Sequence, residues 1–256
     1  SGTIWIGICL ALIRAYPNAL TEALHKHRFG DKGIPLADLV SKEIVINALK
    51  SPHPNEALYA LELLEKSGSE NFTEILIQQL RSPYPEVRIY AAKSIERLKI
   101  NEALSEIKVL FQKDAVPNVR QIAACTWSAL SKNAKDALKL VNSPDTNTSH
   151  GVVVGLLRTR KINEVQEAYQ HLRSLAGSEH AHEKLQAANL LVEIANPQMV
   201  EVLTPLLQDE SIEVKKAALR AAAKTHHPDV YPLVIAALAS PQTRSLAFNA
   251  LVAGRE

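Results

Sequence analysis

The side chains best suited to metal chemistry lie in the stretch EHAHE, residues 179–183, which places His180 and His182 two positions apart. On a helix this spacing separates the two imidazoles by about 200°, so both can reach one ion only if the segment is extended or forms a turn. A polar turn before a helix explains the same residues without a ligand. The sequence therefore predicts no metal site.

No familiar constellation for catalysis occurs elsewhere. The chain has no glycine-rich phosphate loop, nucleophile elbow or CxxC pair. Ser128 and Ser131, beside Trp127, have no His-Asp pair at a spacing that would form a catalytic triad. His226 and His227 precede a proline and are interpreted as polar hinge residues. We therefore predict that the chain is not an enzyme, with no cofactor and no small-molecule substrate.

Composition favours an all-α protein in a reducing compartment. Of 256 residues, only 9 are glycine while alanine and leucine are abundant, and these two residues lose little entropy in a helix. Net charge is +2, so no global field draws the chain to nucleic acid. The two cysteines, Cys9 and Cys125, have neither metal-ligand spacing nor the number needed for a disulfide framework, which predicts a cytoplasmic location.

A repeated pattern of about 30 to 34 residues organises the chain. Each unit reads as the end of one helix, a proline-containing turn and a second helix, whose first turn carries Glu86, Asn118 or Glu213. Small alanines follow at positions where helices must approach closely. The apolar anchors of the units predict about seven helical hairpins stacked into an α-solenoid; they are Leu49, Leu80, Leu110, Val141, Leu175, Leu207 and Leu238.

This pattern resembles HEAT repeats, particularly the short bacterial kind also found in phycobilin lyase-like proteins. The resemblance covers residues 41–256, expected to continue beyond the fragment, and it leaves residues 1–40 as an N-terminal helical extension with a linker. HEAT repeats usually carry an acidic residue in the inter-helix turn, which Asp114 and Asp209 supply here, so an Asp-to-Arg ladder is expected only in part. Di-iron hydroxylases built from HEAT-like repeats use several His-Glu pairs, whereas His182-Glu183 is the sole one in this chain.

The resemblance favours a non-catalytic scaffold that binds protein partners of unknown identity. Two turns look long, Asp145–His150 and Gly177–His182, and would project from one edge of the array. One alternative is a nucleic-acid-binding protein, which is disfavoured because acidic residues interrupt the row of basic residues along the second helices. The other alternative is a phycobilin lyase-like chaperone. The predicted partner-binding residues are Arg88, Lys93, Arg97, Arg120, Asp145, His150, His180, Lys216 and Arg220.

The N-terminal segment has two open interpretations. Residues 4–13 are apolar on all sides of a helix but span only about 15 Å, half a bilayer. They form either a helix that covers the first repeat or the end of a truncated membrane helix. The second alternative resembles bacterial ATP/ADP translocase-like proteins with cytosolic HEAT repeats, and would place the chain at the cytoplasmic face of a membrane through Trp5, Arg14, Tyr16, Lys26 and Arg28.

Overall fold

The computed structural model describes residues 45–253. The predicted N-terminal extension, with Trp5, Arg14, Tyr16, Lys26 and Arg28, lies outside the described residues. The chain divides into two compact units, residues 1–100 and 101–256, which are described separately below.

The prediction of an all-α solenoid is confirmed. Residues 45–253 contain helices and turns but no strand. In the first unit a short helix at 45–48 precedes α3 (Pro54–Lys66), α4 (Phe72–Gln79) and α5 (Pro85–Arg97). The second unit contains α6 (Leu104–Lys113), α7 (Pro117–Leu130), α8 (Ala134–Leu138), α9 (Thr146–Thr159), α10 (Gln166–Ala176), α11 (Ala181–Ile194), α12 (Val200–Leu207), α13 (Ile212–Thr225), α14 (Tyr231–Ala236) and α15 (Arg244–Ala253). Short 3-10 turns precede α6, α10, α12 and α14 and follow α14.

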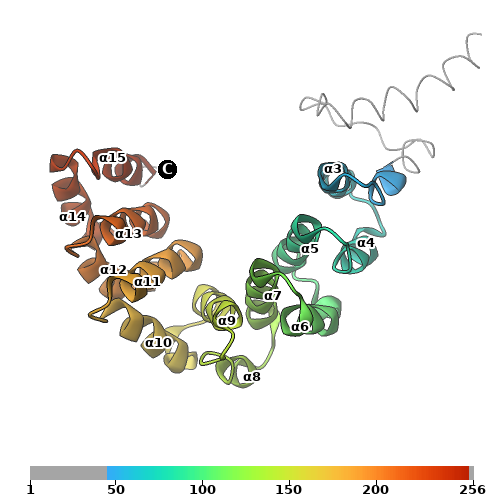
Figure 1. Ribbon diagram of the computed structural model, residues 1–256, viewed down its shortest axis with the longest axis horizontal. Helices are drawn as coiled ribbons and strands as arrows, with labels where there is room; N and C mark the ends of the chain where they lie inside the picture. The colour runs from blue at the N-terminus through green and yellow to red at the C-terminus, as the bar shows by residue number, and fades with distance from the viewer. Residues whose placement is uncertain (1–44, 254–256) are drawn as a thin grey trace, which may run out of the picture. The chain divides into compact units, whose positions relative to one another are not determined.

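The helices alternate between two layers, as the repeat predicts. Within the second unit, α9, α11, α13 and α15 lie side by side along the inner edge of the row, while α8, α10, α12 and α14 follow its outer edge (Figure 1). Several predicted anchors are buried where the first helix of a pair ends, among them Leu80, Val141 and Leu207. These buried anchors lie where the two helices of a hairpin meet, whereas the predicted anchors Leu49, Leu175 and Leu238 are only half-buried.

Helix starts and ends have local causes. Proline occupies the first position of α3, α5 and α7, where its missing N–H costs no hydrogen bond and its fixed φ suits the helix. At the end of α5, Lys99 adopts a φ of 55°, and the backbone N–H of Ile100 donates to the carbonyl of Ile95. Buried Ile100 completes this capping pattern with an apolar contact.

Helix α9 is enclosed on nearly every side. All residues from Gly151 to Leu157 are buried, which is unusual because second helices of such pairs normally expose one face. Two glycines lie against α7: a Cβ added to Gly151 would stand 2.1 Å from the carbonyl oxygen of Gln121, and one added to Gly155 would stand 2.1 Å from Ser128 Oγ. The absence of side chains at these positions therefore lets α7 and α9 approach closely.

The two long turns predicted from the sequence are shorter in the structure. Helix α9 begins at Thr146 because the carboxylate of Asp145 accepts a hydrogen bond from the backbone N–H of Thr148. Most of the stretch Asp145–His150 is therefore helix rather than a projecting loop. Helix α11 likewise begins at Ala181, so His182 lies in its first turn.

Candidate functional site

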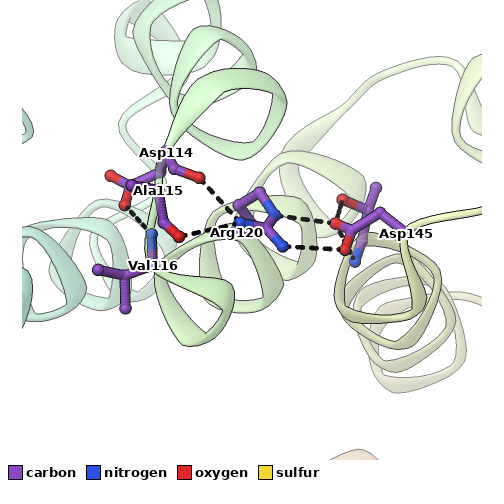
Figure 2. Close-up of polar contacts among 6 residues, drawn as sticks. Asp114, Ala115, Val116, Arg120 and Asp145 are labelled. Atoms are coloured by element: carbon purple, nitrogen blue, oxygen red, sulfur yellow. Dashed lines mark hydrogen bonds and ion pairs between the residues drawn. The ribbon is translucent and has the colours of Figure 1, made fainter.

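A charged contact connects neighbouring repeats between α7 and the start of α9. The guanidinium of Arg120 donates from Nε to Asp145 Oδ2 at 3.0 Å and from Nη2 to Asp145 Oδ1 at 3.1 Å (Figure 2). Its third nitrogen, Nη1, donates to the backbone carbonyl of Asp114 at 2.9 Å. Arg120 therefore connects the turn of its own hairpin to that of the next one.

Asp145 has two roles in this contact. Besides receiving Arg120, its Oδ2 accepts hydrogen bonds from the backbone N–H of Thr148 at 3.1 Å and from the Thr148 hydroxyl at 2.6 Å. The Arg120 guanidinium, helped by the two Thr148 donors, holds the pKa of the Asp145 carboxyl far below its usual range. Asp145 thus stays ionised and anchors the first turn of α9.

The same kind of contact recurs two repeats later between α11 and the turn before α13. Lys184 Nζ donates to Asp209 Oδ2 at 2.7 Å, and only 9% of the Asp209 side chain is exposed. In both pairs the base precedes the acid by 25 residues. Lys184 was not among the predicted site residues, although a search for a base 25 positions before each turn acid would have found it.

Replacing Lys184 with methionine should destabilise the protein by about 1.5 kcal/mol, because the nearly buried carboxylate of Asp209 would lose its charged donor. Urea denaturation of the wild type and of the variant measures the difference in the free energy of unfolding. Lys224→Met is the matched control: Lys224 is exposed and makes no contact within the described residues, so we expect a change below about 0.5 kcal/mol. Equal losses for the two variants would show that the ion pair contributes nothing.

Two predicted partner-binding arginines of the first unit also contact the array itself. Arg97 on α5 donates two hydrogen bonds to the carboxylate of Glu65 on α3, one of them from Nη2 at 2.8 Å. Tyr90 donates to Glu65 at 3.2 Å, and burial, followed by the charge of Glu65, raises the pKa of Tyr90 to about 12. Arg88 donates from Nη1 to the Ser82 carbonyl at 2.8 Å, within its own hairpin.

The two predicted histidines, His150 and His180, have different surroundings. His150 is half-buried on α9, its Nε2 contacts the Gln186 amide nitrogen of α11, and burial together with His171 lowers the pKa of His150. His180 directly precedes α11 and stacks on His182, with ring centroids 5.6 Å apart. In the same turn His182 Nε2 lies 3.9 Å from Glu183 Oε1, at the surface.

The remaining predicted residues are the exposed Lys93 and Arg220 and the half-buried Lys216. Lys93 on α5 and Arg220 on α13 make no hydrogen bond or ion pair with any part of the chain between residues 45 and 253. Lys216 lies one turn before Arg220 and pairs only with Glu213 of its own helix, at 3.0 Å. Lys216, Arg220 and Lys224 recur every four residues and form one stripe, which we call the α13 stripe.

The structure thus divides the predicted partner-binding residues into two groups. Arg88, Arg97, Arg120, Asp145 and His150 contact other parts of the repeats, whereas His180 and Lys216 contact only side chains close to them in the sequence. Lys93 and Arg220 make no hydrogen bond or ion pair within the described residues. Residue type and position on a second helix do not separate these groups, because a base there pairs with the next repeat only where an acid stands within reach.

Comparison with known proteins agrees with the geometry. A family model described as HEAT repeats matches residues 43–126 and 169–253, about two thirds of the chain. The chain belongs to the HEAT-repeat family. The unmatched interval, residues 127–168, contains α8 and the glycine-bearing α9. A search of the curated proteins found no match.

Two solved structures show a loose likeness to the array. Human deoxyhypusine hydroxylase in complex with glycerol has 15% identity, covers 87% of this chain and 99% of its own, and gives a TM-score of 0.41. An engineered protein has 20% identity, covers 72% of this chain and 96% of its own, and gives a TM-score of 0.37.

The prediction that this chain is not an enzyme requires correction. One of the similar structures is a hydroxylase, so a helical-repeat architecture by itself does not exclude an enzyme. The likeness shows neither an activity nor a substrate for this chain. The sequence argument from the single His-Glu pair was therefore too strong as an argument against enzymes in general.

The membrane prediction concerns residues that the structure does not describe. Among residues 45–253 no helix has the length and apolar character needed to cross a bilayer. The predicted attachment through residues 1–28 stays a prediction.

Proposed function

We propose that this HEAT array is a scaffold that binds an acidic segment of a partner protein along the α13 stripe. The observation that carries the proposal is the exposed guanidinium of Arg220. Arg97 and Arg120, bases on other second helices, pair with Glu65 and Asp145 of neighbouring helices or turns, whereas Arg220 makes no hydrogen bond or ion pair within the described residues. A base that the array leaves solvated is available for a partner's carboxylate.

The size of the stripe favours a protein partner over nucleic acid. Three bases on one helix can neutralise about three phosphates, and the net charge of +2 adds little attraction over distance. Glu213, which pairs with Lys216, and the exposed Glu193 on neighbouring α11 would face a phosphate backbone unfavourably. A short acidic peptide avoids both residues.

A random peptide library displayed on phage provides the test. We expect the protein to enrich peptides rich in Asp and Glu. The triple variant Lys216→Glu, Arg220→Glu, Lys224→Glu should bind these peptides with an affinity at least about a hundredfold lower. Binding should also weaken as salt rises, because the charges are exposed.

The matched control is a second triple variant with the same change in net charge, Lys132→Glu, Lys135→Glu, Lys161→Glu. These lysines are exposed and lie in turns or at the start of α8. Equal losses in the two triple variants, or enrichment without acidic residues, would contradict the proposal.

We further propose that the protein works in the cytoplasm. In support, the sequence contains only two cysteines, too few for the disulfide framework typical of secreted domains.

A further inference from the structure

A pocket lies between two neighbouring inter-helix turns of the second unit, next to the Arg120–Asp145 ion pair (Figure 2). Its volume is about 400 Å³, within the range of pockets that bind small molecules. Its lining comes from the end of α6, the turn before α7, α7 itself, and the segment that leads from α8 into the first turn of α9. Described hairpins precede and follow these segments in the chain, so the pocket belongs to the interior of the array.

The buried side of the pocket is apolar. Phe111 is 3% exposed and packs on Trp127 with ring centroids 5.4 Å apart. Helix α8 has five residues, against ten in α6 and eleven in α10, so half-buried Leu140 lies in the turn that follows α8. Phe111 and Leu140 therefore offer an apolar surface to the body of a ligand.

The two carboxylates of the pocket are already engaged. Asp145 receives the Arg120 guanidinium, and Asp114 Oδ1 accepts a hydrogen bond from the backbone N–H of Val116 at 2.9 Å. The hydrogen bonds to Asp145 and, to a smaller extent, the charge of Asp114 raise the pKa of Arg120. Both acids are thus held by donors of the protein, and neither is left to attract a cation.

The polar groups that remain available are donors. Lys113 and Gln112 at the end of α6 are exposed, and Ser143 in the turn before α9 is half-buried. The side chains of these three residues make no hydrogen bond or ion pair with any residue between 45 and 253. An ammonium, an amide N–H and a hydroxyl beside an apolar surface suit a carboxylate that is attached to an apolar group.

We propose that this pocket binds a small organic acid, whose carboxylate contacts Lys113 and Ser143 and whose apolar body lies against Phe111 and Leu140. The pocket is lined by other residues than the α13 stripe, so this inference does not depend on the proposed function. The sequence alone gives no sign of the pocket, because its lining comes from two repeats and forms only where their turns lie side by side.

The test is an NMR titration of the complete, nitrogen-15-labelled chain with three probes of one shape, namely phenylpropionate, phenylpropionamide and phenylpropylamine. We expect phenylpropionate to bind in the millimolar range and to shift the backbone signals of Gln112, Lys113 and Ser143 most. The amide and the amine should bind about tenfold more weakly, because they lack the charge that Lys113 receives.

Two substitutions of one exposed residue test the assigned contact. Lys113→Met should weaken the binding of phenylpropionate about tenfold, since it keeps the length of the side chain and removes the charge. Lys113→Glu should reverse the preference, so that phenylpropylamine binds more tightly than phenylpropionate. The matched control is Lys132→Met, which removes an exposed lysine outside the pocket and should leave the affinity unchanged.

Three results would overturn the inference and leave the proposed function standing. The first is equal binding of the acid and the amide, and the second is an unchanged affinity in Lys113→Met. The third is the absence of shifts at Gln112, Lys113 and Ser143 when phenylpropionate, hexanoate and indoleacetate are each added to saturation.

Discussion

Gly155→Ala is expected to destabilise the protein by about 3 kcal/mol, although alanine is the better helix former by about 1 kcal/mol. The new methyl group would lie 2.1 Å from Ser128 Oγ and 2.4 Å from the backbone carbonyl oxygen of Cys125. The hydroxyl can rotate away, but the carbonyl belongs to the α7 backbone, so the two helices must separate. Urea denaturation followed by circular dichroism measures the loss.

The control for this prediction is Gly177→Ala at the end of α10. Its added Cβ would meet nothing closer than 3.4 Å, the Arg173 carbonyl oxygen, and its φ of −92° suits any residue. We expect this change to stay within about 0.5 kcal/mol. Gly155→Ala with wild-type stability would show that α7 and α9 lie farther apart in solution than the structure places them.

The second large effect is expected for Asp145→Ala, which should destabilise the protein by about 2 kcal/mol. The substitution removes the cap of α9, worth about 1 kcal/mol, together with the acceptor of the Arg120 guanidinium. Asp145→Asn separates the two contributions, because asparagine still caps a helix but carries no charge. We therefore expect Asp145→Asn to lose less stability than Asp145→Ala when both are measured by urea denaturation.

The pH dependence of these variants follows from the same carboxylate. Arg120 and Thr148 hold the folded-state pKa of Asp145 well below the unfolded value of about 3.9. The contribution of the ionised Asp145 to the free energy of unfolding is therefore complete at neutral pH. It declines as the pH falls below about 5 toward the folded-state pKa. The stability gap between wild type and Asp145→Asn should narrow with acidification. A gap that stays constant down to pH 3 would contradict the assigned ion pair.

These two sites give α9 a definite place in the architecture. Gly155 sets how closely α9 approaches α7, and Asp145 fixes where α9 begins. Both lie between residues 127 and 168, the interval that the HEAT family model leaves unmatched.

The sequence by itself determined the repeat architecture. Proline-containing turns, anchors such as Leu80 and Leu207, and alanines at close-approach positions are local signals, and they predict hairpins without knowledge of the neighbours. Even the family followed from these signals. The sequence also led to a mistaken exclusion, because the absence of a catalytic motif was treated as evidence against any enzyme.

Only the tertiary structure decided which partner each charged side chain contacts. Arg120 and Arg220 are both arginines on second helices, yet Arg120 pairs with Asp145 and Arg220 is exposed to solvent, because pairing depends on which side chain the next turn brings within about 3 Å. The stretch from Asp145 to His150 reads as a turn by composition, but its first carboxylate caps a helix that neighbouring helices then enclose. Burial and pairing are properties of two segments together, so one segment's residues cannot specify them.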